Sequence, residues 1–465
     1  MQYRYRVMAV YIVGLFMTII DGTVVNVALP TLAREFNVAS TDIEWVSVAY
    51  LLAFAAVIPA AGWLGDRFGT KRMFLVALAI FVVASGLCGA APTLRTLVAF
   101  RVLQGLGAGL ITPIGSAMLF RAFPLKERST ATVGVLSVAV VAPAIGPVLG
   151  GVIVDNTSWR WIFFVNLPIG VVALTLAWLW LREERQPAPG RLDIRGLVLS
   201  ATGVSLLIYT LSAAPENGWL SWSTFATGTV GLMAMIGLVT TELRIEQPML
   251  QLRLFSNQLF RVVNISASMV YAGFFGWIFI LPLYMQTLRG FNATQSGLVQ
   301  APQAVALFIV SNLLGKRVYR TVGPRRLMIV GSAVTAVATG SFVFADLDTP
   351  LWMIASGSFM RGAAVGMVFV SIQTAVYATV SIADTGRAAS VFNTQRQISF
   401  AIGVALAASV VAVKVSSVGG DSAPAIDRLP AYQWGFLAMG ILMLPAALAS
   451  WFVRDSDVAA TRGLP

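Results

Sequence analysis

Histidine is absent from this 465-residue sequence, and there is only one cysteine, Cys88. Without histidine, an imidazole proton relay and a histidine-ligated metal are excluded. Cys88 cannot form an internal disulfide and lies in an apolar run, so we interpret it as a small packing residue. No nucleophile–base–acid set and no P-loop of the form GxxxxGK[ST] is found either. We therefore expect no enzymatic activity, no ATP-driven step, no metal and no cofactor.

Charged residues are also scarce. They make up 11% of the chain, whereas 57% is hydrophobic, and soluble domains carry about 25% charged residues. Apolar runs near the ~20 residues that a helix needs to cross a bilayer recur along the whole chain. They lack the alternation of barrel strands, so the spans are predicted to be helices. We interpret the first apolar run as a retained helix and not as a cleaved signal peptide.

Apolar windows and the polar breaks between them predict fourteen transmembrane helices. The predicted spans are residues 8–29, 43–64, 72–91, 97–120, 131–154, 161–181, 194–214, 221–241, 260–288, 296–315, 327–345, 351–377, 388–415 and 432–453.

The basic residues predict the orientation of these helices. Most of the 32 Lys and Arg residues fall on one side of the predicted membrane, which is the positive-inside pattern. It places both termini in the cytoplasm of a multi-pass protein in the cell (inner) membrane. The net charge of +12 then reflects topology, and we expect no nucleic-acid partner.

Two sequence patterns recur in the second half of the chain. Residues 62–72 have a weaker echo at 316–326, and residues 101–105 are echoed at 361–366. Such repeats predict two related six-helix bundles. We therefore expect an all-α polytopic membrane protein with three parts: a bundle at 1–185, two extra linking helices at 186–255 and a second bundle at 256–465.

Five motifs occur in order within the first 170 residues. Residues 62–72, GWLGDRFGTKR, match the loop signature of the major facilitator superfamily, and residues 101–109, RVLQGLGAG, resemble its helix-4 arginine motif. Residues 143–151, PAIGPVLGG, are similar to its antiporter motif. Residues 21–30 and 159–170 resemble signatures of its 14-helix drug:proton antiporters. The resemblance implies the major facilitator fold and a multidrug efflux protein, of the kind that gives antibiotic resistance, working by alternating access.

Asp21 is the only acid inside the predicted spans. A charge there costs about 2.5–3.5 kcal/mol, so we interpret it as functional, with a structural ion pair as the alternative. The predicted depths of Asp21 and Arg101 differ by about 7 Å, within reach of an arginine side chain. Burial disfavours an ionised carboxyl and a nearby arginine favours it, so small rearrangements can load and unload a proton. Asp21 and Arg101 are therefore the predicted proton-coupling residues.

Conformational gating is predicted for residues of the loop and antiporter motifs. An ordinary charged loop and close packing of small residues are the alternatives. The resemblance implies that Asp66 packs against the start of a helix in the second half, near residues 386–390. The predicted gating residues are Gly62, Gly65, Asp66, Arg67, Gly69, Arg72, Pro143, Gly146, Pro147, Gly150 and Gly151.

Polar and aromatic residues on shared helix faces are candidates for a substrate cavity. They are Thr18, Asn26, Gln104, Thr112, Tyr271, Phe274, Phe275, Trp277, Tyr284, Arg361, Asn393, Arg396, Gln397 and Phe400. The aromatic residues are equally expected in packing or at membrane interfaces. The two arginines could instead bind backbone carbonyls or open onto cytoplasmic water.

A single acid limits the transport energetics. Exchange of one proton for a monocation uses only the pH gradient, about 1.4 kcal/mol per unit. Export of a dication would work against the membrane potential, about 2.3 kcal/mol per charge per 100 mV. We therefore expect proton-coupled export of a small lipophilic substrate that is neutral or monocationic. An exporter of an endogenous lipid or anionic amphiphile, or a non-transporting receptor, are the alternatives. We expect a monomer in the lipid bilayer, and a periplasmic accessory protein stays an open alternative.

Overall fold

The computed structural model describes residues 2–38, 43, 45–124, 127–185, 193–245, 248, 250–291, 293–311, 315–381 and 384–462. Throughout this part of the chain every regular element is helical. Twelve of its helices are long and apolar enough to cross a membrane. Helices α6 (Arg128–Asn156) and α12 (Ala293–Ile309) stand where two further spans were predicted. The fold is thus an all-helical membrane bundle consistent with the fourteen expected spans.

The first half of the chain forms one bundle. Its remaining helices are α1 (Tyr3–Phe36), α3 (Trp45–Phe68), α4 (Thr70–Gly89), α5 (Leu94–Ala122), α7 (Trp161–Phe164) and α8 (Asn166–Trp180). Helix α5 packs against α3, α4 and α1, and its many glycines and alanines permit these close approaches. A methyl group on Gly105 would lie only 2.4 Å from the carbonyl oxygen of Tyr50. Helix α5 therefore holds the centre of the first bundle.

The second half forms a matching bundle. Its long helices are α11 (Gln258–Leu283), α12, α14 (Pro324–Gly340), α15 (Leu351–Ala375), α16 (Thr385–Ser417) and α17 (Ala425–Ser450). The shorter elements are η2 (Leu252–Ser256), the π-helical turn η3 (Tyr284–Leu288), α13 (Gly315–Val322), η5 (Ser341–Phe344), η6 (Gly420–Ser422) and α18 (Asp455–Arg462).

The repeat between the halves is visible in the backbone. Gly69 caps the start of α4 with φ +99°, and Gly323 caps the start of α14 with φ +87°. Both values lie in the left-handed region, which a glycine adopts without the cost that a side chain would add. The two glycines are the matched positions of the 62–72 motif and its echo, so the sequence repeat coincides with a structural one.

The two extra helices, α9 (Ile194–Asn217) and α10 (Trp222–Arg244), come between the two halves in the sequence. They pack against each other. Asp193 and Ser221 cap their starts by accepting hydrogen bonds from Gly196 and Thr224. Helix α9 also packs against α3 of the first half and α16 of the second.

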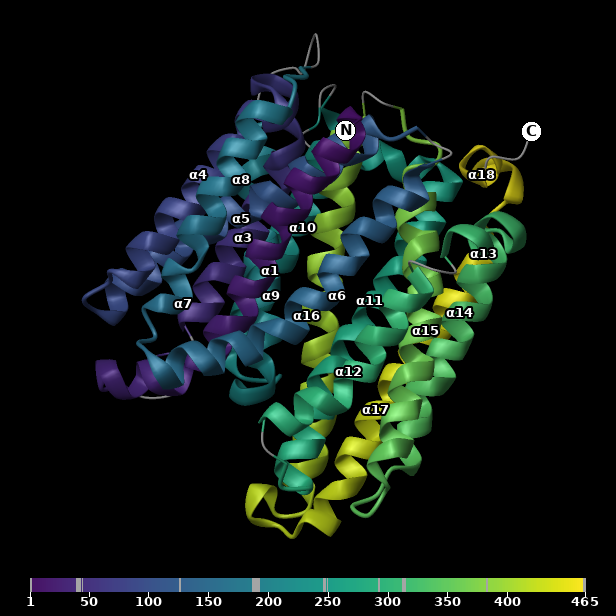
Figure 1. Ribbon diagram of the computed structural model, residues 1–465. Coiled ribbons are helices and arrows are strands. Elements are labelled where there is room, and N and C mark those ends of the chain that lie inside the picture. Colours follow the sequence, from purple (N-terminus) through teal and green to yellow (C-terminus); the bar gives the residue numbers. More distant parts are fainter. Residues whose placement is uncertain are drawn as a thin grey trace.

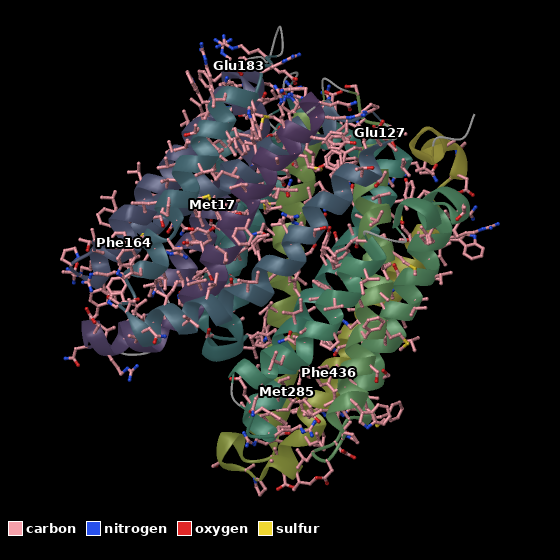
Figure 2. The ribbon with its side chains drawn as sticks, in the orientation of Figure 1. Met17, Glu127, Phe164, Glu183, Met285 and Phe436 are labelled. Carbon is pink, nitrogen blue, oxygen red and sulfur yellow. The ribbon has the colours of Figure 1, made fainter. Side chains whose placement is uncertain are left out.

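Both chain termini lie at the same end of the bundle, at the top of Figure 1. We call this the termini end. Glu183 and Glu127 lie toward it, whereas Met285 and Phe436 of the second half lie toward the opposite end (Figure 2). Figure 1 also shows α6 and α16 between the outer helices of the two halves.

Some boundaries differ from the sequence prediction. The span predicted at 161–181 is interrupted at Val165 between α7 and α8. In the span predicted at 296–315, the α-helix reaches Ile309 and is followed by π-helical Val310 and Ser311. Helices α3 and α10 extend further than expected and take in the buried acids Asp66 and Glu242 near their last residues. Both acids lie in the last turn of their helices, beyond the ends of the predicted spans at 64 and 241, so the structure adds two buried acids at helix ends to Asp21.

Candidate functional site

Asp21 lies in the first bundle, near the middle of α1, and its carboxylate is enclosed by donors from two other helices. Arg101 of α5 donates through Nη1 to Oδ2 at 2.5 Å. Gln104 donates through Nε2 to Oδ1 at 2.8 Å, and Asn166 of α8 donates to the same oxygen at 3.2 Å. Asp21 is 1% exposed and Arg101 is 0% exposed. A buried charge pair of this kind is held by its hydrogen bonds and not by solvent.

Arg101 joins Asp21 to a further helix. Its Nε donates to the carbonyl oxygen of Val46 in α3 at 3.0 Å, and its guanidinium lies 4.1 Å from the ring centroid of Tyr50. It also donates to Gln104 Oε1 at 2.8 Å. Neutralising Asp21 would leave this buried cation without its counter-ion, so the charge on Asp21 bears directly on how α1, α3 and α5 pack.

The predicted polar stripes on α1 and α5 pack inside the first bundle. Thr18 is buried and donates to the carbonyl oxygen of Leu15, and Tyr50 donates to the carbonyl of Thr18 at 3.4 Å. Thr112 is also buried. The side chain of Asn26 lies outside the described residues. The Asp21 cluster is therefore closed off in this state.

Asn166 is a member of this cluster that was not predicted. It belongs to the 159–170 motif, but nothing in its spacing reveals which helix it faces. Its Nδ2 also lies 3.1 Å from the hydroxyl of Ser85 in α4. Helix α8 begins at Asn166, directly after the break at Val165, and this start places the Asn166 amide at the depth of Asp21.

The loop motif contacts the second half at the termini end. The backbone N–H of Gly62 donates to the hydroxyl of Ser390 in α16 at 2.9 Å. Asp66 accepts from Arg121 Nη2 at 2.8 Å, with both side chains 4% exposed. A methyl group on Gly386 would lie 3.4 Å from Asp66 Oδ1, so this carboxylate lies against the first turn of α16. Exposed N–H groups at a helix start favour an anion there. We call Gly62, Asp66, Arg121, Gly386 and Ser390 the Asp66 gate, after the gating role predicted for Gly62 and Asp66.

A second set of contacts joins the halves beside the Asp66 gate. Arg128 donates through Nη1 to the carbonyl oxygen of Tyr377 at 2.7 Å. The rings of Phe120 and Tyr377 stack with centroids 4.5 Å apart. The hydroxyls of Thr132 and Thr374 lie 3.5 Å apart. The halves are therefore closed against each other at the termini end.

The other residues of the loop motif have different surroundings. Arg67 is exposed, and the Cβ of an alanine at Gly65 would meet only ordinary contacts, the nearest at 3.6 Å. The side chain of Glu183 lies against Gly69 and accepts from the backbone N–H of Arg72 at 3.3 Å. These residues fix the turn between α3 and α4.

The antiporter motif packs on α1 next to Asp21. A methyl group on Gly146 would lie 1.9 Å from Thr23 Oγ1, and one on Gly150 would lie 3.2 Å from the carbonyl oxygen of Val24. A methyl group on Gly151 would meet nothing within 4 Å. The side chains of Pro143 and Pro147 lie outside the described residues. Gly146 thus marks a close helix contact within one turn of Asp21.

Arg361 repeats the environment of Arg101 without an acid. It is completely buried and donates to Thr339 Oγ1 at 2.9 Å, to Gln303 Oε1 and to the carbonyl oxygen of Phe274. Its guanidinium lies 4.1 Å from the ring centroid of Trp277. An amide therefore accepts from Arg361 where a carboxylate accepts from Arg101.

The predicted cavity aromatics fall into two places. Tyr271, Phe274 and Phe275 form a cluster with Phe369, Phe392 and Phe400 from α15 and α16. Tyr284 lies instead toward the opposite end of the second half, where its hydroxyl donates to the carbonyl oxygen of Asp346. Trp277 packs on Arg361 and Phe342.

A small cavity lies between the halves, near the Asp66 gate. It is lined by Tyr11, Ser116, Phe120, Thr132, Val135, Gln373, Tyr377, Phe392, Asn393 and Arg396. Asn393 also donates to the carbonyl oxygen of Ala389 at 2.8 Å. Gln397 is half-buried on the next position of α16. Asn393 and Arg396 are therefore the predicted cavity residues that line this space.

Comparisons with known proteins agree with this architecture. The chain matches the Major Facilitator Superfamily over residues 11–404 and 263–463. It is 32% identical over 401 residues to the multidrug export protein EmrB of Haemophilus influenzae, covering 84% of this chain and 77% of that protein. It is also 32% identical over 410 residues to the fatty acid resistance protein FarB of Neisseria gonorrhoeae, covering 85% of this chain and 78% of that protein.

The fold has a counterpart among solved structures. The crystal structure of the human organic anion transporter MFSD10 (TETRAN) superposes with a TM-score of 0.68 at 14% identity, covering 95% of this chain and 100% of that one. With its repeated bundles, its ordered motifs and these similarities, the chain belongs to the Major Facilitator Superfamily and is a multi-pass membrane transporter.

Proposed function

We propose that this protein is a proton-coupled exporter of the drug:H⁺ antiporter type, which moves lipophilic neutral or monocationic compounds outward by alternating access. It works in the cell (inner) membrane with both termini in the cytoplasm, so the termini end is the cytoplasmic end. The positive-inside pattern of the loops supports this orientation. The names of the relatives, among them a multidrug export protein, support the direction of transport.

The observation that carries the proposal is the buried ion pair of Asp21 and Arg101. Arg101 and Gln104 come from α5 and Asn166 from α8, so the carboxylate of Asp21 holds three helices together. When Asp21 takes up a proton, its attraction for Arg101 falls, and the arginine keeps only neutral acceptors such as the Val46 carbonyl. The packing of α1 against α3 and α5 then changes, which couples protonation to conformation.

The Asp66 gate supplies the second element of the mechanism. It closes the cytoplasmic side through Gly62, Ser390, Asp66 and Arg121. With this gate closed the cargo leaves on the outer side, and Asp21 takes up a proton from the outer medium when the cluster around it opens outward. The halves then rock, the gate opens, and Asp21 releases its proton to the cytoplasm as the next cargo binds.

The charge of the cargo decides how much energy one proton supplies. The pH gradient contributes about 1.4 kcal/mol per unit, and each net charge moved inward contributes about 2.3 kcal/mol per 100 mV. Exchange for a monocation moves no net charge, exchange for a neutral compound moves one, and exchange for a monoanion moves two. Export of a dication for one proton runs against the potential. The scheme therefore favours cargo with at most one positive charge.

An anionic amphiphile is a second candidate cargo. Arg396 supports it, because this arginine lines the cavity between the halves. One relative is named a fatty acid resistance protein. The same proton cycle at Asp21 would drive either class of cargo.

Efflux in proteoliposomes tests the proposal. An imposed proton gradient should drive efflux of a neutral or monocationic dye by the wild type, and Asp21→Asn should reduce it to background. The variant should still equilibrate the dye down its own gradient, because the cavity is unchanged. Ser358→Ala, which replaces a buried hydroxyl of α15 that belongs to none of the predicted site residues, is the matched control. Gradient-driven efflux that survives in Asp21→Asn would refute the coupling.

A further inference from the structure

Arg396 lies in the cavity between the halves, and the cavity lining comes from both of them. Tyr11 is on α1 and Thr132 on α6, whereas Asn393 and Arg396 are on α16. The space measures about 20 Å³, enough for about one water molecule. We expect this space to widen when the two halves separate at the cytoplasmic end, because its lining comes from both of them.

Arg396 is a positive charge without a nearby carboxylate among the described residues. Arg396 is half-buried, and within the described part of the chain no carboxylate lies within 4.0 Å of it. The cavity lining contains no acid either. Arg101 and Arg121, by contrast, are paired with Asp21 and Asp66. A half-buried guanidinium without a counter-ion has donors to offer to an anion from outside the chain.

Phenol groups lie in and beside the same cavity. Tyr11 and Tyr377 line it together with Arg396. The hydroxyl of Tyr271 accepts a hydrogen bond at 3.3 Å from Gln373, which lines the cavity as well. Tyr11 belongs to the first half, and Tyr271 and Tyr377 to the second. Hydroxyl donors and a guanidinium together suit a planar oxyanion, whose lone pairs can accept several hydrogen bonds.

Aromatic side chains of α11 and α16 continue from this polar group toward the opposite end of the bundle. Phe400 lies one turn after Arg396 on α16, and its ring centroid is 4.7 Å from that of Phe275. Phe275 in turn stacks on Tyr271 at 6.3 Å. The site is thus charged at the cytoplasmic side and apolar beyond it, which matches a molecule with an anionic head and an apolar tail.

We propose that Arg396, with Tyr11, Tyr271 and Tyr377, forms the binding site for the anionic headgroup of an amphiphilic cargo such as a long-chain carboxylate. The inference rests on the proposed function and specifies its second candidate cargo. The headgroup enters while the cytoplasmic gate is open. Tyr377 also stacks on Phe120, and its carbonyl oxygen accepts a hydrogen bond from Arg128. The same residue therefore belongs to the headgroup site and to the contacts that close the two halves at the cytoplasmic end.

Equilibrium binding to the full-length protein in nanodiscs tests the site. The probes are dansyl-undecanoic acid, which is ionised at pH 7.5, and its primary amide, which has the same tail but no charge. The wild type should bind the acid about 10- to 100-fold more tightly than the amide, the range expected for a charge-assisted contact. Arg396→Gln should bring the two affinities within about 3-fold of each other. Arg396→Lys should keep most of the preference, and Arg326→Gln, an exposed arginine at the same end, should keep all of it.

Two results would overturn the inference: equal affinity of the wild type for acid and amide, or a preference for the acid that survives in Arg396→Gln. The wild-type comparison decides the matter even if the glutamine variant fails to fold. No proton gradient is present in this experiment. Asp21→Asn should retain the preference, so failure of the headgroup site and failure of proton coupling give different results.

Discussion

Gly62 donates its backbone N–H to the hydroxyl of Ser390 at 2.9 Å, although 328 positions separate the two residues. The contact requires α3 and α16 to approach so closely that no side chain fits between them. A methyl group on Gly62 would lie 2.8 Å from the carbonyl oxygen of Gly386. The gate is therefore built on backbone contact between the two halves, and small changes at Gly62 should shift the balance between its closed and open forms.

Gly62→Ala should disfavour the closed gate by about 1–3 kcal/mol, because overpacking a tight contact costs that much. The readout is thiol labelling of a cysteine placed at Asn393 in a Cys88→Ala background, since Cys88 is the only natural cysteine. Labelling should become faster in Gly62→Ala. Gly65→Ala is the matched control, because its nearest contact would be an ordinary 3.6 Å. Equal labelling rates in both variants would contradict the role of Gly62.

Asp66→Ala should open the same gate more strongly. Removing one member of a buried ion pair costs about 3–5 kcal/mol, because the other charge stays buried. Arg121 would lose the carboxylate that accepts from it at 2.8 Å. The same cysteine reporter measures the effect, and Arg67→Gln, an exposed neighbour, should leave the rate unchanged. A closed gate in Asp66→Ala would show that the pair is dispensable.

Asn166→Ala should lower proton-driven transport. The amide donates to Asp21 Oδ1 at 3.2 Å, and loss of a hydrogen bond to a charged group costs about 1.5–3 kcal/mol. The carboxylate would then be held less firmly between α1, α5 and α8, and gradient-driven efflux from proteoliposomes should fall. Ser85→Ala is the control, because Ser85 contacts Asn166 but has no bond to Asp21. An equal loss of efflux in both variants would place the effect in packing.

Gly146→Ala should destabilise the contact between α6 and α1. A methyl group would collide with Thr23 Oγ1 at 1.9 Å, whereas one on Gly151 would meet nothing within 4 Å. We expect a loss of about 1–3 kcal/mol for Gly146→Ala and almost none for Gly151→Ala, measured by thermal unfolding in detergent. Adding Thr23→Ala should restore part of the loss. No rescue would mean that the strain lies elsewhere.

Gln303→Ala should destabilise the second bundle by about 1–3 kcal/mol, because Arg361 would keep a buried donor without its acceptor. Gln303 is buried and accepts from Arg361 Nη1. Gln258→Ala removes an exposed amide from the same half and is the control. Thermal unfolding and the proton stoichiometry should be measured together. A changed stoichiometry would indicate that Arg361 takes part in coupling.

The sequence by itself determined the helical spans of this protein and the pairing of Asp21 with Arg101. Apolar runs of membrane length dictate helices, because no other element satisfies its backbone within itself in hydrocarbon. The cost of burying a charge marks Asp21, and the helical rise places Arg101 at a reachable depth. These arguments use distances along one helix. They predicted the helical character of the spans, twelve of which qualify among the described residues, and the Asp21–Arg101 contact.

Tertiary structure decided which helix faces meet. Asn166 donates to Asp21 across 145 positions, Arg128 reaches Tyr377 across 249, and Gly62 reaches Ser390 across 328. The helical repeat identifies which residues of one helix share a face. It does not identify which face of which other helix they contact. The enclosure of Asp21 inside the first bundle, and the position of Arg396 in the cavity between the halves, follow from packing of distant helices, where close contact of small residues selects one arrangement among many.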